Sequence, residues 1–472
     1  MQSQPIDYPQ NMHPSLFCHS KFAIISKKLR SIMLKRKFYN QLVQWKSSHS
    51  QECLFVKGAR QIGKTFIIDY FGKQNYTSYL YINFILNNEA TRIFEGSLEA
   101  DTIFKTISAY YPNFRLIPGE TLIFLDEIQA CPRARTALKS FAIDGKADVI
   151  ASGSLLGINF LDDGLEKERS QESIPVGYEK HMTMLPMDFE EFLWALGHIE
   201  NSIGILRESF ENLTQVPTSI NDKFLQIFRE YITIGGMPEV VNAFVQGNSF
   251  SLAFDVQEQI KNSNLDDIAR YAAKTEKPKI RACYLSMPSQ LARENKKFKY
   301  SEVERGGSAR KFGNSIDWLR ESALAFQCFN VTIPELPLNV YRENGCFKMY
   351  ATDTGILCAM MGFNVKKAIV ENTLKGFAKG GLYENAIAQQ LISRGYNPHY
   401  YQKNSSVGEI DFVIERHGGI IPIEVKAGHT SSTSFDNLLN SKDTEIGYKF
   451  IRGNIGRAGK KVTLPHYMSM FI

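Results

Sequence analysis

The sequence predicts a multidomain α/β protein, and three observations support this fold class. The chain has 472 residues, enough for roughly two to four domains of ordinary size. Between residues 53 and 155, short apolar runs alternate with longer mixed stretches, which is typical of a parallel sheet covered by helices. Between residues 203 and 275, apolar residues recur at helical spacing, so a helical domain is expected to follow the sheet.

The composition is that of an ordinary globular protein. Hydrophobic residues make up 43% and charged residues 22% of the chain, and the net charge is a mild +6. No apolar stretch approaches the roughly 20 residues that span a bilayer, and the first thirty residues lack the order of a signal peptide. The seven cysteines are scattered without any Cys-x-x-Cys pair, so we interpret them as reduced thiols. We therefore expect a cytoplasmic protein with no membrane contact.

The chain divides into five predicted segments. Residues 1–32 are polar and then basic without a clear period, and we expect a poorly ordered extension, with Met33 as an alternative start. Apolar residues at helical spacing begin at Leu34, and Gly235-Gly236-Met237-Pro238 breaks the later helical pattern. Residues 280–345 read as three short helices followed by two strands, the order of a winged helix. The predicted domains are 33–202 around the parallel sheet, 203–279 as a helical lid, 280–345 as the winged helix, and 346–472 as a second α/β domain.

A phosphate-binding loop is predicted at Gly58-Ala59-Arg60-Gln61-Ile62-Gly63-Lys64-Thr65. This run follows the apolar strand 54–56 and opens the helical run 66–71, which is the context that a P-loop requires. Its N–H groups would face the phosphates, Lys64 would reach the β- and γ-phosphates, and the Thr65 hydroxyl would ligate Mg²⁺. The alternative is a glycine-rich turn between strand and helix.

A second signal of nucleotide chemistry is the strand 122–125, which ends in Asp126-Glu127. A Walker B strand delivers an acid beside the P-loop magnesium. We expect Asp126 to hold Mg²⁺ and Glu127 to polarise the attacking water as general base. The next strand, 149–151, ends in Ser152-Gly153-Ser154, where a hydroxyl would contact the γ-phosphate; an ordinary serine-rich turn remains the alternative.

The chain resembles the prokaryotic AAA-type ATPases, and within them the group with a C-terminal domain of unknown function. The motifs that carry the resemblance are the P-loop, Phe124-Leu125-Asp126-Glu127-Ile128-Gln129, Ala151-Ser152-Gly153-Ser154, Pro186-Met187-Asp188-Phe189-Glu190-Glu191-Phe192, Gly235-Gly236-Met237-Pro238 and Tyr350-x-x-Asp353-Thr354-Gly355. The resemblance covers nearly everything after Met33. It implies ATP as the nucleotide, an AAA-type fold with Ser152 or Ser154 as sensor, a helical lid, a winged helix and a restriction-endonuclease-like end. The arginine finger stays open among Arg133, Arg135 and Arg169, and a finger acting in trans would require a homo-oligomer.

The C-terminal segment contains a pattern that resembles the PD-(D/E)XK nucleases. Asp411 begins an apolar strand, and Glu424-Val425-Lys426 lies on the next one. Glu424 and Lys426 are two apart, so on a strand both point to one face. Asp411, Glu424 and Glu384 would then hold a Mg²⁺ that activates water, with Lys426 stabilising charge. The alternative is a solvent-facing ion pair on an edge strand.

Residues 290–311 carry seven basic and three acidic side chains, a local excess of four positive charges. In a helix-turn-helix such residues contact DNA phosphates, and Arg310 and Lys311 open the predicted second helix, 312–325. A solvated helix face is the alternative, and Phe298 and Tyr300 are either base-stacking or core residues. Two functions remain open: an ATP-driven DNA-acting protein with a nuclease-like end, and a nucleotide-switched interaction module whose C-terminal domain does not cut.

Overall fold

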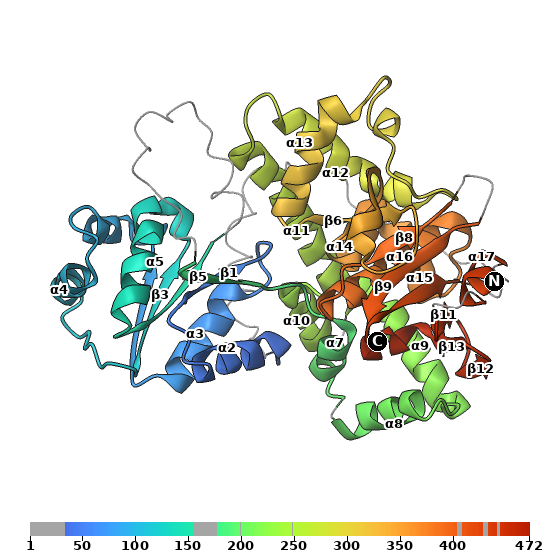
Figure 1. Cartoon of the computed structure of the whole chain (residues 1–472), viewed down its shortest axis with the longest axis horizontal. Helices are drawn as coiled ribbons and strands as arrows, with labels where there is room; N and C mark the ends of the chain where they lie inside the picture. Colours follow the sequence, from blue (N-terminus) through green and yellow to red (C-terminus); the bar gives the residue numbers. More distant parts are fainter. Residues whose placement is uncertain are drawn as a thin grey trace, which may run out of the picture. The chain divides into compact units, whose positions relative to one another are not determined.

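Five parallel strands form the first sheet of the computed structural model, in the order β2-β3-β4-β1-β5 (Figure 1). These strands are β1 (Cys53–Lys57), β2 (Ser78–Asn83), β3 (Thr121–Asp126), β4 (Asp148–Ser152) and β5 (Glu179–Thr183). The alternation of strands and helices between residues 53 and 155 thus forms a parallel sheet, as the sequence predicts.

Helices cover both faces of this sheet. They are α2 (Lys37–Ser47), α3 (Lys64–Asn75), α4 (Ala100–Tyr110) and α5 (Pro132–Asp144), with short 3₁₀ turns η1 (Asn88–Phe94) and η2 (Ile128–Ala130). Leu54 and Val56 of β1 pack into the core with α2 and α3, whereas Phe55 faces the core with α4 and α5. Because successive side chains of a strand point to opposite faces, this division explains why the strands are apolar throughout.

A run of helices follows the sheet. It comprises α7 (Phe189–Ala195), α8 (Glu200–Glu211), α9 (Thr218–Ile234), α10 (Pro238–Gly247), α11 (Phe250–Tyr271), α12 (Lys277–Leu291) and α13 (Ala309–Glu321). The predicted break is confirmed, since α9 ends at Ile234 and α10 begins at Pro238. The structure describes residues 34–153, 177–198, 200–247, 249–403, 408–427, 433–440 and 444–472, which belong to one compact unit, Leu34–Ile472. Among the described helices, none is both long and apolar enough to cross a bilayer.

The second sheet has eight strands and is mixed, in the order β12-β13-β11-β10-β9-β8-β6-β7. The strands are β6 (Ala325–Val331), β7 (Arg342–Ala351), β8 (His399–Tyr401), β9 (Ile410–Arg416), β10 (Gly419–Val425), β11 (Gly447–Ile451), β12 (Gly456–Ala458) and β13 (Lys461–Pro465). The remaining helices are α14 (Thr354–Met361), α15 (Phe363–Val370), α16 (Gly376–Ser393) and α17 (Thr433–Leu439), with 3₁₀ turns η3 (Tyr300–Glu302), η4 (Leu338–Tyr341) and η5 (His466–Phe471). The two strands expected to carry Asp411 and Glu424 are β9 and β10, which pair antiparallel as a hairpin.

The predicted boundary between residues 345 and 346 falls inside β7. The helices α12 and α13 are followed by the antiparallel pair β6 and β7, in the order expected of a winged helix. However, β6 also pairs in parallel with β8, so the expected wing is part of the C-terminal sheet. Edge strands offer unpaired N–H and C=O groups, and the sequence alone does not show which neighbour takes them.

Candidate nucleotide site and carboxylate cluster

The loop Gly58–Thr65 connects β1 to the first turn of α3. Gly58 and Gly63 adopt φ angles of 147° and 86°, a region that favours glycine. A Cβ at position 58 would also overlap the carbonyl oxygen of Met184, so the close approach of β1 and the segment after β5 requires glycine there. The N-terminus of α3 therefore faces a wrapped backbone of the kind that binds anions.

Lys64 folds back over this loop. Its ammonium donates to the carbonyl oxygens of Gly58 at 2.9 Å and Ala59 at 2.8 Å. Burial lowers the pKa of Lys64 to about 8, although the carboxylates of Glu127 and Asp126 oppose this shift. The amine is thus held beside the loop by acceptors that a phosphate could replace.

Asp126 ends β3, is only 2% exposed, and collects four hydroxyl or amide donors. Thr65 donates from Oγ1 at 2.9 Å, Tyr81 from its hydroxyl at 3.1 Å, and Asn83 from Nδ2 at 3.1 Å, all to Oδ2. Ser152 donates to Oδ1. The P-loop and the acid after β3, which are 61 positions apart, therefore meet through Thr65 and Asp126.

The other predicted catalytic residues stand around this carboxylate. Glu127 has a positive φ of 55°, and its Oε2 accepts a hydrogen bond from Gln129. Ser152 is fully buried, and its hydroxyl donates to the carboxylate of Asp126. Ser154 lies outside the described residues.

These residues fit ATP and magnesium by the chemistry of their donors. Lys64 and the loop N–H groups would hold the phosphates, while Thr65 and Asp126 offer oxygen ligands of the kind that Mg²⁺ prefers. Bound magnesium would neutralise charge that develops on the phosphates. Glu127 is the acid nearest in sequence to Asp126 and remains the candidate general base.

Three contributors to this region were missed by sequence reasoning. Arg36 donates from Nη1 to the carbonyl oxygen of Ile62 at 3.1 Å, which ties the start of α2 to the P-loop. Tyr81 and Asn83 reach Asp126 from β2. The sequence feature that could have identified Asn83 is its place at the end of the neighbouring strand, where it is in register with Asp126 of β3. The polar end of a neighbouring parallel strand is where such support is expected.

The P-loop also reaches the helical region. Arg60 forms an ion pair with Asp267 of α11 at 2.7 Å, and its second nitrogen donates to the hydroxyl of Tyr271 at 2.5 Å. Burial raises the pKa of Asp267 to about 6, while Arg60 opposes the rise. Gln61 adopts a positive φ of 62° within the loop.

The described candidates for an arginine finger each contact a different partner within the chain. Arg133 donates to the carbonyl oxygen of Phe94 at 2.6 Å, and Arg135 pairs with Glu179 at 2.9 Å. Arg169 lies outside the described residues. Arg133 and Arg135 are thus engaged within the chain.

Three motifs of unassigned role meet at one junction. The N–H of Met187 donates to the carbonyl oxygen of Gly236 at 2.7 Å, and the N–H of Gly236 donates to Asp353 Oδ2 at 2.6 Å. Asp353 also accepts from the N–H of Ile356 at 2.9 Å and caps α14. Burial raises the pKa of Asp353 to about 6, although these backbone donors oppose the rise.

Helix α16 links this junction to the C-terminal sheet. Asn385 accepts from the N–H of Ala351 at 2.8 Å, and Gln389 accepts from the N–H of Thr354 at 3.0 Å. Gln390 accepts from the N–H of Phe189 at 3.0 Å. The residue before Asn385 on the same helix is Glu384.

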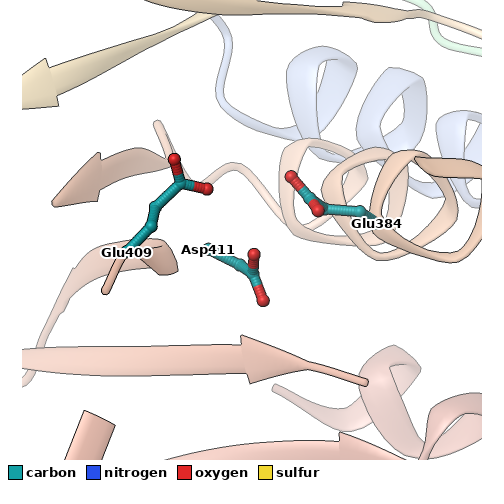
Figure 2. Close-up of side chains that lie close together, drawn as sticks. All are labelled: Glu384, Glu409 and Asp411. Carbon is teal, nitrogen blue, oxygen red and sulfur yellow. The ribbon is translucent and has the colours of Figure 1, made fainter. Parts of the chain in front are cut away.

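Glu384, Glu409 and Asp411 form a carboxylate cluster whose nearest oxygens all lie within 4.8 Å of one another. Figure 2 shows Glu384 reaching from its helix toward the two acids on the neighbouring strand segment. The sequence predicted Glu384 and Asp411 but missed Glu409. Its signal was the spacing of two from Asp411, which places both side chains on one face of an extended segment.

The predicted third ligand, Glu424, is engaged differently. Its carboxylate is fully buried and forms an ion pair with Lys426, and it is not part of the carboxylate cluster among the described residues. Asp411 Oδ2 accepts from the N–H of Val425 at 2.8 Å. Burial, with the charges of Glu424 and Glu384, raises the pKa of Asp411 well above its ordinary range, against the opposing pull of Lys348 and Lys426.

Mg²⁺ does not fit the C-terminal residues as they stand. Lys348 of β7 is fully buried, and its ammonium lies 2.8 Å from Glu384 Oε1, contacts Glu409, and lies 3.9 Å from Asp411 Oδ1. A cation is therefore already in place among the three acids. The magnesium role expected for Glu384, Asp411 and Glu424 is not supported by this arrangement.

Several basic residues of 290–311 form ion pairs within the chain. Lys296 pairs with Glu384 at 2.8 Å, Arg293 with Glu302 at 2.6 Å, and Lys311 with Glu304 at 2.7 Å. Lys297 donates to the sulfur of Cys346 at 2.8 Å. Of the basic residues in 290–311, Lys299, Arg305 and Arg310 are exposed and form no ion pair with the described part of the chain. Phe298 is buried and stacks on Phe347, so it belongs to the core.

Three family models match the chain. An AAA domain matches residues 50–193, a domain of unknown function (DUF8612) matches residues 225–367, and another (DUF4143) matches residues 379–464. No curated protein matches the sequence. The chain therefore carries an AAA-type P-loop ATPase domain followed by two domains of unknown function.

The chain is also similar to solved structures at low sequence identity. The Walker-type ATPase of Pyrococcus abyssi is 14% identical, with 70% of this chain and 96% of that chain covered and a TM-score of 0.41. PCH-2 of C. elegans is 11% identical, with 48% of this chain and 61% of that chain covered and a TM-score of 0.23.

Proposed function

We propose that the chain is an ATP-hydrolysing switch, in which the nucleotide bound at Gly58–Thr65 controls the state of the C-terminal domain. The observation that carries this proposal is the set of hydrogen bonds from the P-loop side of the molecule to α16. Pro238 lies near Gly63, since a Cβ built on Gly63 would be 3.9 Å from its Cγ. Gly236 is hydrogen-bonded to Asp353, and α16 is hydrogen-bonded to both Thr354 and Phe189. A change at the phosphates is therefore transmitted through these contacts to α16, the helix that carries Glu384.

The proposed chemistry assigns one role to each residue of the nucleotide site. Lys64 holds the β- and γ-phosphates, Thr65 and Asp126 hold magnesium, and Glu127 orients the attacking water. Ser152 positions Asp126 through its hydroxyl. Ser154 is the remaining sensor candidate, and the base preference for adenine follows from the AAA family.

For the C-terminal domain, the interaction module is the better supported of the two functions considered. A cleaving domain needs metal ligands that are open to an ion and a phosphate. Here Lys348 pairs with Glu384, and Lys426 pairs with Glu424. The proposal is therefore a nucleotide-switched partner-binding protein, active as a homo-oligomer if an arginine finger acts in trans.

The test is phosphate release by the purified chain with Mg²⁺ and ATP or GTP, together with hydrogen exchange of α16 in each nucleotide state. Lys64→Ala is expected to abolish binding, and Glu127→Gln to keep binding while hydrolysis falls by roughly 10²–10⁴-fold. The matched control is Lys73→Ala on α3, whose exposed pair with Asp69 leaves the site untouched. Normal phosphate release by Lys64→Ala would refute the assignment of the nucleotide site. A hydrogen-exchange rate of α16 that does not change with the bound nucleotide would refute the proposed switch.

DNA contact is a second candidate, supported by the exposed side chains of Lys299, Arg305 and Arg310 near the start of α13. Phosphate contacts make binding depend on salt, so removing all three should lower the slope of log affinity against log salt by about 2–3. Fluorescence anisotropy with a short duplex measures this slope, and Lys367→Ala on α15 is the control because its side chain is 63% exposed. Equal binding by the wild type and the triple variant would exclude this surface.

A further inference from the structure

The carboxylate cluster is buried together with an almost equal number of ammonium groups. Lys296 and Lys348 contact the acids Glu384, Glu409 and Asp411, and the separate ion pair of Glu424 and Lys426 acts on Asp411 by its charges, which makes four acids and three lysines in all. Buried charges are stable only when they are paired and hydrogen-bonded. The arrangement is thus close to neutral without any added ion.

Lys348 is the central cation of this group. It is fully buried on β7, which is paired antiparallel with β6, so its side chain is directed to one face of the sheet by the strand. Its ammonium bridges Glu384 and Glu409 and lies 3.9 Å from Asp411. These are the three acids whose oxygens could otherwise share one metal ion.

The oxygens of Glu384 are also committed to other donors. Oε1 accepts from Lys348 and from the hydroxyl of Tyr350, and Oε2 pairs with Lys296 at 2.8 Å. Burial raises the pKa of the Glu384 carboxyl, but Lys296 and Lys348 outweigh it and hold the pKa far below its ordinary value. Glu384 is therefore charged and neutralised from within the chain.

A magnesium ion would have to compete with these groups. Mg²⁺ requires near-octahedral oxygen ligands at about 2.0–2.1 Å. A neighbouring ammonium repels the ion and occupies the lone pairs of the carboxylate oxygens that would bind it. With four acids and three lysines, a divalent ion would leave an excess of positive charge in a buried place. Expulsion of Lys348 from a fully buried position would itself leave an ammonium without partners.

We infer that Lys348 is a built-in counter-ion that stands in the place of a divalent metal, so that the carboxylate cluster is a closed ionic core and not a cleavage centre. This inference does not depend on ATP turnover. It goes beyond the proposed switch, because it assigns a role to the cluster at the far end of α16.

The test is a Mn²⁺ titration of the full chain without nucleotide, followed by electron paramagnetic resonance of the free ion. The wild type is expected to bind more weakly than about 1 mM. Lys348→Met removes the ammonium while keeping the length of the side chain, and it is expected to tighten Mn²⁺ binding by at least about tenfold. Adding Asp411→Asn to that variant should remove the gain.

Two controls separate charge from packing. Lys348→Arg keeps a cation and should gain no Mn²⁺ site, and Lys367→Met on α15 should behave as the wild type. A folded Lys348→Met variant with no gain would overturn the inference. If that variant does not fold, the measurements on the wild type test the inference. Weak Mn²⁺ binding supports the closed core. Either tight Mn²⁺ binding or Mg²⁺-dependent plasmid nicking would overturn the inference, provided that Asp411→Asn abolishes it.

Discussion

The N–H of Phe189 donates to Oε1 of Gln390 at 3.0 Å, across 201 positions of the chain. The amide nitrogen of Gln390 in turn donates to the hydroxyl of Tyr231 at 3.1 Å, and that hydroxyl donates to the carbonyl oxygen of Met187 at 2.8 Å. One buried side chain on α16 therefore joins the end of the AAA domain, at Phe189, to helix α9, at Tyr231. Because every polar atom in this chain of bonds is satisfied internally, movement of one segment must be followed by the others or break a bond.

Replacing Gln390 should break the connection between α16 and the segments that contain Phe189 and Tyr231. Gln390→Ala leaves the N–H of Phe189 without its buried acceptor, so we expect a loss of about 2–4 kcal/mol in the free energy of unfolding. We also expect hydrogen exchange in α16 to become independent of nucleotide while phosphate release continues, since Gln390 is remote from the P-loop in the contacts described. Ser393→Ala on the same helix is the control, and it should change stability by less than about 0.5 kcal/mol. Retention of nucleotide-dependent exchange in Gln390→Ala would contradict this role.

Gly236 gives a test of the junction by steric means. A Cβ at position 236 would overlap backbone atoms of Met187, so Gly236→Ala should destabilise the protein by about 2–4 kcal/mol and break the bond to Asp353. Gly204 on α8 is the matched control, because a Cβ there meets nothing within 4 Å. Alanine in that helix should be neutral or stabilise by up to about 1 kcal/mol. Thermal unfolding of the two variants measures the difference, and equal melting temperatures would refute the tight approach.

The parts of this molecule that sequence reasoning found are those encoded by local patterns. The P-loop, the strand ending in Asp126 and the hairpin carrying Asp411 are each contained in a short run with the correct period. The contact between the P-loop and Asp126 also follows from topology, because carboxyl ends of parallel strands lie at one edge of a sheet.

What could not be predicted depends on distant pairing. Lys348 reads as one charged residue in an apolar strand, and only the folded structure brings it to Glu384, 36 positions away. The same holds for Lys296, which looked like part of a basic surface but pairs with Glu384. The sequence shows the acids of a metal-binding motif but not the cations that reach them, so the ion pairs on which the proposed closed core rests could not be foreseen.

The pair of Arg60 and Asp267 predicts a dependence of stability on pH. Asp267 has an ordinary pKa of 3.8 that burial raises to about 6, so between these values the folded protein holds a proton that the unfolded chain has released. The free energy of unfolding contributed by this group is therefore largest at low pH and falls as the pH rises through about 6, by up to roughly 1–3 kcal/mol. Asp267→Asn should remove this slope. Unfolding of α11 by hydrogen exchange at pH 4–8 measures it, and identical slopes in both proteins would count against the shift.

Lys64 predicts how nucleotide affinity depends on pH. Burial lowers its pKa to about 8, with Glu127 and Asp126 opposing, so the free protein begins to lose this charge above that pH. Phosphate favours the ammonium form, and binding must then take up a proton. The affinity for ATP should be constant below about pH 8 and fall by up to roughly tenfold per unit above it. Fluorescent-nucleotide titrations at pH 6.5–9.5 measure the dissociation constant directly. Lys64→Arg keeps its charge throughout this range, so its affinity, though weaker, should lack the fall. A wild-type affinity that stays flat to pH 9.5 would show that Lys64 is not held by burial in the state that binds nucleotide.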